Sequence, residues 1–289
     1  MEYEIQPCVE NDAEFIEERA DEASDAIAPP EPGAEEERFV FKIRDADGNI
    51  LGGCWLGIDT WKSAAIYDLW VEPEYRRRGM ASALIHAAER KARERRCPLM
   101  MVGTFDFQAR PLYEKHGYTL VDTMPDFPKG HQHYLLIKRL GLSSKENESD
   151  DSCGFEVVPG DENDAEHLCE KLNAHDAACV PRAHKYVPLG KKVTDGDGKI
   201  IAGFIGGVNG WNGADIDALW VDEPYQRQGI GSVLLRAAER EAKENGAYLM
   251  ILDAFEWNVD FYKKNGYEVT GVLEGFPEGH TMYCIQKYL

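Results

Sequence analysis

Two glycine-containing turns carry the pattern that says most about chemistry in this sequence. One follows the apolar run in LWVEPEYRRRGMASALI, which begins at Leu69, and the other follows the run in LWVDEPYQRQGIGSVLL, which begins at Leu219. Small residues let the backbone approach a ligand, and free amides at the start of a helix attract an anion. The pattern predicts a pyrophosphate site in each turn, to which the flanking Arg76, Arg77 and Arg227 add positive charge.

The spacing of the turns excludes two other phosphate-binding motifs. A dinucleotide fold requires a third glycine where Leu234 stands, and a nucleotide-triphosphate loop requires Gly-Lys followed by Ser or Thr. Both turns instead resemble the R/Q-x-x-G-x-G/A signature of the GCN5-related N-acetyltransferase (GNAT) superfamily. The residues that satisfy this signature are Arg76, Gly79 and Ala81 in the first turn and Gln226, Gly229 and Gly231 in the second.

The resemblance covers nearly the whole of each half and includes LYEKHGY, which ends at Tyr118, and FYKKNGY, which ends at Tyr267. It implies that acetyl-coenzyme A is the cosubstrate. The strand before each turn would pair with the pantetheine arm, the turn would hold the pyrophosphate, and an amide side chain would contact the coenzyme. The coenzyme-binding residues so implied are Leu69, Trp70, Val71, Arg76, Arg77, Gly79, Met80, Ala81, Ser82 and Gln108 in the first half, and Leu219, Trp220, Val221, Gln226, Arg227, Gly229, Ile230, Gly231, Ser232 and Asn258 in the second.

By the same resemblance, Tyr113 and Tyr262 lie near the coenzyme sulfur and act as general acids. An alkylamine with a pKa of about 10 must lose a proton before it attacks, whereas a thiolate leaving group with a pKa of about 8.5 must gain one. A tyrosine is protonated at neutral pH and can supply that proton. The structural alternative is a ring that only packs in the core.

The general base is less well defined by the sequence. Asp217, beside the expected acetyl site, is the first choice in the second half. Its counterpart is Tyr67, and strand alternation predicts that Asp68 points to the opposite face. Asp106 and Glu256 are second choices, and a solvated or structural carboxylate is the alternative for all of them.

Two histidines recur in matching loops, His131 in FPKGH and His280 in FPEGH. They could line the acceptor pocket or relay a proton, and turn structure alone is an equally good explanation. His131 and His133 together could ligate a metal, but Met282 stands opposite His133 in the second copy. We therefore predict no metal site.

An internal repeat sets the domain organisation. The segment Leu69–Val102 reappears as Leu219–Leu252 at a constant shift of 150 residues, so the chain is a duplication. The polar, acidic segment near residue 150 has no periodicity and is typical of a linker. The sequence predicts an N-terminal domain over 1–141, a linker over 142–153 and a C-terminal domain over 154–289. The duplication predicts an internal pseudo-dimer within a monomeric chain.

Each copy is predicted to be an α/β (α+β) domain with a mixed, largely antiparallel sheet flanked by helices. A short strand, Tyr3–Ile5 or Phe155–Val158, precedes a helix that begins in the ENDAE segment. Lys192–Val193 is the predicted strand before the Asp-x-Gly turn of the second copy. The helical segments diverge most between the copies, so we expect them to shape two different acceptor clefts.

The composition limits the classes of binding partner and the cellular location that we expect. The formal net charge of −20 disfavours nucleic-acid and anionic-membrane partners. The absence of long apolar runs and of a basic start predicts a cytoplasmic protein. Seven cysteines without a C-x-x-C pair predict free thiols.

These observations together predict direct acetyl transfer from acetyl-coenzyme A to a primary amine of a small molecule or a protein lysine. No cysteine lies in a shared motif, which favours attack without an acetyl-enzyme. One alternative is that a single half catalyses while the other is a structural or coenzyme-sensing partner. Another is an interaction protein that binds no coenzyme.

Overall fold

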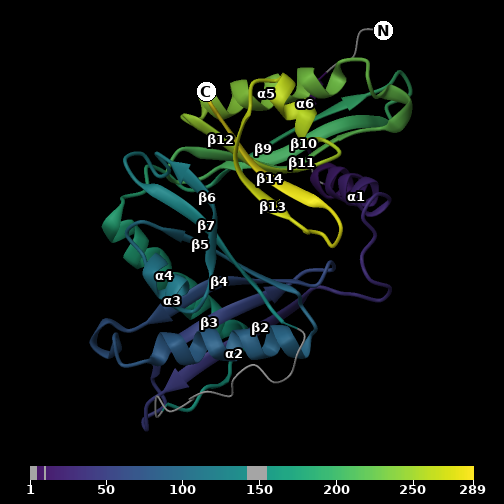
Figure 1. Ribbon diagram of the computed structural model, residues 1–289. Coiled ribbons are helices and arrows are strands. Elements are labelled where there is room, and N and C mark those ends of the chain that lie inside the picture. Colours follow the sequence, from purple (N-terminus) through teal and green to yellow (C-terminus); the bar gives the residue numbers. More distant parts are fainter. Residues whose placement is uncertain (1–4, 10, 142–154) are drawn as a thin grey trace. The chain divides into compact units, whose positions relative to one another are not determined.

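The computed structural model describes residues 5–9, 11–141 and 155–289. Two compact units, each built on a seven-stranded sheet, make up the fold (Figure 1). Unit N comprises Pro30–Asp126 and Gly130–Pro181, and unit C comprises Met1–Pro29, Phe127–Lys129 and Arg182–Leu289. The mixed, largely antiparallel sheets with helices confirm the predicted fold class. The predicted linker, 142–153, lies outside the described residues.

The sheet of unit N has the strand order β6-β7-β5-β4-β3-β2-β8, in which β4 and β5 are parallel and the other neighbours antiparallel. The strands are β2 (Glu37–Arg44), β3 (Ile50–Ile58), β4 (Ser63–Val71), β5 (Leu99–Phe105), β6 (Thr119–Pro125), β7 (Gln132–Arg139) and β8 (Val158–Pro159), and the helices are α2 (Met80–Glu94), α3 (Arg110–Lys115) and α4 (Glu162–Cys179).

The sheet of unit C repeats this order as β13-β14-β12-β11-β10-β9-β1, with β11 and β12 parallel. The strands are β1 (Ile5–Pro7), β9 (Val187–Thr194), β10 (Ile200–Val208), β11 (Gly213–Val221), β12 (Leu249–Phe255), β13 (Glu268–Glu274) and β14 (Thr281–Tyr288), and the helices are α1 (Asp12–Asp25), α5 (Ile230–Glu244) and α6 (Val259–Lys264). Strand β9 is longer than the predicted Lys192–Val193, because its pairing with β10 continues through residues that show no clear alternation.

The units exchange their first strand and helix. Strand β1, from the first repeat, pairs with β9 of the second, and α1 packs on β10 and β11. Strand β8, from the second repeat, pairs with β2 of the first, and α4 packs on β3 and β4. Figure 1 shows α4, in teal, beside the strands of unit N. The compact units therefore differ from contiguous halves of the sequence by this exchange.

A buried ion pair fastens each exchanged helix to its sheet. In unit N, Lys42 of β2 pairs with Asp164, the N3 residue of α4, and both side chains are 8% exposed. In unit C, Lys192 of β9 pairs with Asp12 of α1 at 2.7 Å, with side chains 15% and 11% exposed. The ENDAE segments thus supply the acid that docks each helix.

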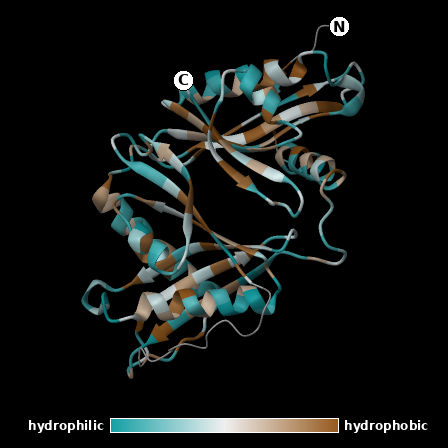
Figure 2. Cartoon of the chain, in the orientation of Figure 1, coloured by the Kyte–Doolittle hydropathy of each residue, from teal (hydrophilic) through white to brown (hydrophobic). Residues whose placement is uncertain are grey.

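Helices α2 and α5 cover their sheets because each has one apolar stripe. Leu84, Ala88 and Ala92 of α2 are fully buried, as are Leu234, Ala238 and Ala242 of α5. Figure 2 shows hydrophobic residues along the central strands and alternating hydrophilic and hydrophobic bands on the helices. Among the described residues, no helix has both the length and the apolar composition that a membrane crossing requires.

Candidate active site

The parallel strands at the centre of each sheet separate toward their carboxyl ends. Strands β4 and β5 pair only from Ser63 to Ile66, although β4 continues to Val71. Strands β11 and β12 pair only from Gly213 to Asp215. The backbone groups beyond these points are not used in that ladder, so they are available to a ligand that enters the gap. This is the separation that the family resemblance implies.

A β-bulge in β4 corrects one prediction from the sequence. Asp68 lies opposite Trp55 and Ile66 lies opposite Leu56, so Tyr67 is the extra residue of the bulge. Residues directly opposite in a ladder share a face, which puts Asp68 on the face of Trp55. The Tyr67 ring also lies against Trp55, with ring centroids 5.2 Å apart. The prediction that Asp68 points away from Tyr67 is therefore wrong, because the bulge interrupts strand alternation.

The glycine turns have the geometry of an anion cradle. Gly79 and Gly229 precede α2 and α5 with φ of 94° and 87°, left-handed values that a side chain would strain. The amides of the first helical turn have no partner within the helix. They face the direction from which a pyrophosphate would approach the helix.

The first residue of the R/Q-x-x-G-x-G/A signature is hydrogen-bonded to the end of the preceding strand. Arg76 Nε donates to the Val71 carbonyl at 2.9 Å, and Gln226 Nε2 donates to the Val221 carbonyl at 3.0 Å. The Arg76 guanidinium also lies 4.6 Å from the centroid of the Trp70 ring. Arginine and glutamine are interchangeable here because each supplies one donor to the end of the strand.

Unit N contains a cavity of about 660 Å³ that extends from the glycine turn, through the gap between β4 and β5, to α4. Leu172 and His175 of α4 line it together with Tyr67. It is also lined by every site residue predicted in the first half: Leu69, Trp70, Val71, Arg76, Arg77, Gly79, Met80, Ala81, Ser82, Gln108 and Tyr113.

The predicted residues of the second half take the matching places in unit C. They are Leu219, Trp220 and Val221 at the end of β11, Gln226, Arg227 and Gly229 in the turn, Ile230, Gly231 and Ser232 at the start of α5, and Asn258 and Tyr262 beside α6. A cavity of about 300 Å³ beside this turn is lined by Gly229, Ile230 and Ser232, with Ile5 of β1 and Arg236.

Tyr113 and Tyr262 are each 6% exposed. Burial raises the pKa of Tyr262 to about 12. Burial also raises the pKa of Tyr113 above its ordinary value, and the nearby Cys54 and Asp68 add to the effect. Both phenols therefore carry their proton at neutral pH, as a general acid requires.

Gln108 and Asn258 brace the turn between strand and short helix. The side-chain oxygen of Gln108 accepts from the Phe105 amide at 2.9 Å, and that of Asn258 accepts from the Phe255 amide at 2.7 Å. Gln108 Nε2 also donates to both carboxylate oxygens of Asp176 at 3.0 Å. The sequence therefore paired two residues, Gln108 and Asn258, whose side-chain amides stabilise the same turn in both units.

The carboxylates differ between the units. In unit C, Asp217 is exposed on the bulge of β11. Burial raises the pKa of Asp215 to about 7, and the charge and hydrogen bond of Asp217 add to the shift. Burial raises the pKa of Tyr186 to about 12, again with both acids contributing. In unit N, burial and then the charge of Asp176 raise the pKa of Asp68.

The sequence placed Asp68 on the wrong face and did not single out Asp176 or Asp215. The signal for Asp215 was present, because residues two apart in a strand share a face and Asp215 is two residues from Asp217. Asp176 stands in the other repeat from Gln108, so no local pattern could connect the two residues.

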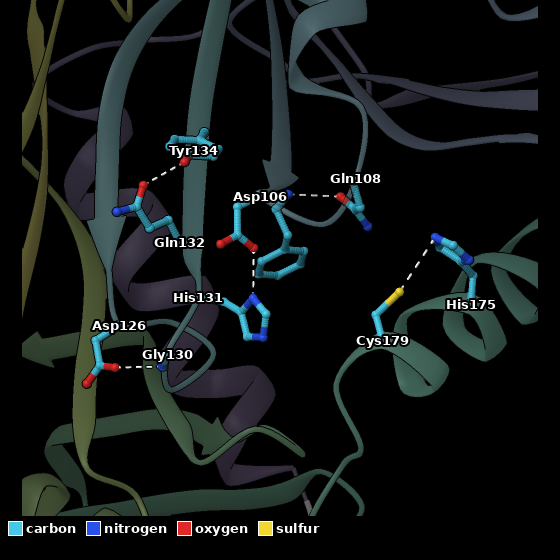
Figure 3. Close-up of polar contacts among 10 residues, drawn as sticks. Asp106, Gln108, Asp126, Gly130, His131, Gln132, Tyr134, His175 and Cys179 are labelled. Atoms are coloured by element: carbon cyan, nitrogen blue, oxygen red, sulfur yellow. Dashed lines mark hydrogen bonds and ion pairs between the residues drawn. The ribbon is translucent and has the colours of Figure 1, made fainter. Parts of the chain in front are cut away.

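The second-choice carboxylates pair with the repeated histidines. His131 Nδ1 lies 2.9 Å from Asp106 Oδ1, and His280 Nδ1 lies 2.9 Å from Glu256 Oε1. Figure 3 shows Asp106 and His131 pointing toward each other near Gln108. These pairs tie the residue after β5 or β12 to the end of the FPxGH loop, which lies between β6 and β7 or between β13 and β14, so the loop histidine has the same structural role in both units.

Comparison with known proteins shows which family this chain matches. The model of the Acetyltransferase (GNAT) family matches residues 6–118 and 156–267. Blasticidin-S acetyltransferase of Streptomyces morookaense is 39% identical over 94 residues, which are 32% of this chain and 68% of that protein. An acetyltransferase of Yersinia pestis (strain Pestoides F) is 37% identical over 87 residues, 29% of this chain and 61% of that protein.

Solved structures of similar proteins include an acetyltransferase from Bacillus cereus ATCC 14579, with 32% identity, a TM-score of 0.44, and coverage of 46% of this chain and 97% of that chain. A GNAT family acetyltransferase from Elizabethkingia anophelis, solved with acetyl-CoA bound, is 19% identical with a TM-score of 0.31 and coverage of 35% of this chain and 76% of that chain.

Proposed function

The chain belongs to the acetyltransferase (GNAT) family, and from that premise we propose that each unit binds acetyl-coenzyme A and transfers its acetyl group directly to a primary amine. The observation that carries the proposal is the cavity of unit N, which joins the glycine turn to Tyr113 through the gap between β4 and β5. A coenzyme that lies along the turn places its thioester in that gap.

The residues fit the coenzyme in three respects. The first-turn amides of α2 and Arg77 supply donors and charge for a pyrophosphate. From Tyr67 to Val71, β4 no longer pairs with β5, and its edge on that side supplies backbone groups for the pantetheine amides. The cavity volume of about 660 Å³ leaves room for an acceptor at the end nearest α4.

The reaction requires two proton movements. A carboxylate takes a proton from the acceptor ammonium, and the free amine attacks the acetyl carbon as the new C–N bond forms. When the C–S bond breaks, the thiolate takes the proton of Tyr113 in unit N or Tyr262 in unit C, and the tyrosine regains a proton from the amide nitrogen. In unit C we assign the first step to Asp217 with its neighbour Asp215. The buried Asp68 is the corresponding group in unit N.

The named relative suggests one acceptor to test. Blasticidin S belongs in an amine panel because the relative from Streptomyces morookaense is named for it. Small primary amines and peptides with a lysine complete the panel. The alternative that only one unit catalyses remains a second proposal, favoured by the unequal carboxylates of the units.

Calorimetric titration of the full chain with acetyl-coenzyme A tests the proposal. Two sites per chain support two working units, and one site supports a single working unit with a specialised partner. No binding would overturn the proposal. Gly79→Val and Gly229→Val each put a side chain on a left-handed residue and so disrupt one glycine turn. Each variant should therefore lose one of the acetyl-coenzyme A sites.

A further inference from the structure

We propose that His116 is a positioning residue of the coenzyme site in unit N: it takes up a proton as the coenzyme binds and donates a hydrogen bond to the Ser82 hydroxyl, which in turn donates to the pyrophosphate. The inference rests on the proposed function and adds to the site a residue that lies outside the glycine-turn signature. It also predicts a pH dependence of coenzyme binding in unit N that unit C lacks.

Ser82 lies at the turn that is expected to hold the coenzyme pyrophosphate. It is the third residue of α2, which begins after the left-handed Gly79. It lines the cavity of unit N together with Gly79 and Arg77. The amide of Ser82 is one of those that have no partner within the helix, so its hydroxyl stands beside the donors that would hold an anion there.

A histidine from the next helix contacts this hydroxyl. His116 directly follows α3, and its Nε2 lies 2.9 Å from Ser82 Oγ. The ring of His86, on α2, lies edge-on to the ring of His116, with ring centroids 4.9 Å apart. All three residues are half-buried, so water only partly screens a charge on either imidazole from a phosphate bound at Ser82.

The direction of the hydrogen bond decides what the hydroxyl can do. A neutral imidazole that accepts at Nε2 takes the only hydrogen of the Ser82 hydroxyl. A protonated imidazole donates at Nε2 and is a stronger donor than a neutral one, so the hydroxyl hydrogen is free for a phosphate oxygen. An anion bound at Ser82 therefore favours the protonated form of His116, and by linkage the protonated form favours binding of the anion.

The groups around His116 leave this negative charge for the coenzyme to supply. Those whose charges act on the ring most are His86 and Glu89 of α2, Lys115 of α3 and Lys138 of β7. Glu89 is the one carboxylate among them, and it already pairs with Lys138 at 2.7 Å. Burial, followed by the charge of His86, lowers the pKa of His116, so the ring is mainly neutral at pH 7 before the coenzyme binds.

Unit C differs at both histidines and keeps the serine, as Ser232. At the positions that match the two histidines it has Asn265 and Arg236. Asn265 Nδ2 donates to the Phe261 carbonyl at 2.8 Å, within its own helix. Arg236 lines the cavity beside Ser232, and a guanidinium keeps its charge over the whole neutral range of pH. Unit C thus has a fixed cation where unit N has titratable rings, and it serves as an internal control.

The test uses the full chain and dephospho-coenzyme A, which keeps the pyrophosphate and lacks the phosphate monoester that itself titrates near about pH 6. Calorimetry at pH 6 and pH 8 gives the Kd, and titration in buffers of different ionisation enthalpy gives the protons taken up. Gly229→Val leaves the site of unit N, and Gly79→Val leaves that of unit C. His116→Asn introduces the side chain that unit C has. His167→Asn removes a histidine of α4 that does not line the cavity and is the matched control.

With Gly229→Val, the Kd of dephospho-coenzyme A should be about fivefold lower at pH 6 than at pH 8, and protons should be taken up on binding. His116→Asn should abolish both effects. Ser82→Ala should abolish them too, because the hydroxyl links the ring to the phosphate, whereas Ser82→Thr keeps a hydroxyl and should preserve them. His167→Asn should change neither. With Gly79→Val, the Kd should differ by less than about twofold between the two pH values.

The outcomes separate this inference from the proposed function. A full chain that binds no acetyl-coenzyme A would overturn both. Coenzyme binding whose pH dependence and proton uptake are unchanged by His116→Asn would overturn this inference alone. An effect of His116→Asn on binding of acetyl-coenzyme A but not of dephospho-coenzyme A would overturn the pyrophosphate as the partner of Ser82.

Circular dichroism checks that each variant is folded. If Gly229→Val is not folded, the parent chain provides the same test, because the histidine occurs in unit N and is replaced by Asn265 in unit C. The parent should then take up more protons on saturation with dephospho-coenzyme A than His116→Asn does, and equal uptake would overturn the inference.

Discussion

In unit N the bulge of β4 carries Tyr67 and Asp68, whereas in unit C the bulge of β11 carries Asp217 and Ala218. An aromatic ring nevertheless covers the same spot in both. A Cβ at Gly57 would come within 2.3 Å of the Tyr67 ring, and a Cβ at Gly207 would come within 2.1 Å of the Tyr186 ring. The ring is retained although it comes from β4 in one unit and from the residue before β9 in the other.

Under the proposed function, the carboxylates that differ between the units face the acceptor, and the groups that the units share face the coenzyme. Both units have a left-handed glycine before the helix, a side chain that donates a hydrogen bond to the end of the preceding strand, and a buried tyrosine. The carboxylates, by contrast, sit on different residues and even on different elements. We therefore propose that the duplication has kept one acetyl-donor site and allowed two different acceptor sites.

We expect the largest difference between the two units at the ion pairs that attach the exchanged helices to their sheets. Lys42→Met leaves the buried Asp164 with only the more distant Arg44 as its cation, at 3.6 Å, and we expect a loss of about 3 kcal/mol in the free energy of unfolding. Lys192→Met leaves the more accessible Asp12 without its cation and should cost about 2 kcal/mol. Urea unfolding followed by tryptophan fluorescence measures both, and equal losses would contradict the difference in burial.

The same ion pairs predict a dependence on pH. Burial alone would raise the pKa of Asp164, but the hydrogen bond and charge of Lys42 hold it below its ordinary value. The stabilisation is therefore present above the ordinary aspartate pKa and is lost as pH falls through the lowered one. Lys42→Met should reduce this acid sensitivity, because only the Asp161 amide and Arg44 then hold the pKa down, and the comparison serves as the internal control for the unfolding measurement.

The tyrosines test whether both units catalyse. If they do, Tyr113→Phe and Tyr262→Phe should each leave roughly half of the acetyl transfer to a shared acceptor, and the double variant should lose about 100-fold in kcat. Phenylalanine keeps the ring that packs against Tyr118 or Tyr267, so stability should change little. One single variant as inactive as the double would assign catalysis to that unit alone. Full activity of the double variant would show that neither tyrosine is the general acid.

The acid pair of unit C predicts a pH profile whose midpoint lies near pH 7. With Tyr113→Phe in the full chain, transfer by unit C should rise about tenfold from pH 6 to 8, because the pKa of Asp215 is about 7 and the base acts when ionised. Asp217→Asn removes one member of the assigned base pair, so it should lower the rate, and the loss of its charge should move the midpoint of the remaining activity to lower pH. A midpoint that does not move would show that the rise reflects only the amine.

The smallest expected effect lies at the hairpin tips. Burial raises the pKa of Asp59 to about 6, whereas unit C has Asn209 at the matching position, and both side chains accept from backbone amides of the turn. A raised pKa means that unit N loses stability as pH rises from about 4 to about 6. Asp59→Asn should restore about 1 kcal/mol at pH 7.5, after allowance for solvent screening, and should change nothing at pH 4. Thermal unfolding at the two pH values measures this, and equal effects would refute it.

Much of the architecture follows from local sequence. Alternation, glycine turns and the amphipathic stripes of α2 and α5 predicted the strands, the helices and the place of the coenzyme turn, because these depend on contacts between near neighbours in the chain. The repeat itself predicted two sheets of one kind. Tyr113 and Tyr262 were predicted from a family motif, and both are buried in the cores of their units.

Only the tertiary structure decided which copy of the first strand and helix completes which sheet. Both ENDAE segments carry the aspartate that pairs with Lys42 or Lys192, so the local sequence is compatible with either partner. The direction of Asp68 was likewise decided by a bulge, which arises from the register between β3 and β4 and not from the pattern of β4 alone. Strand pairing is a non-local choice, and the acceptor face of each unit depends on it.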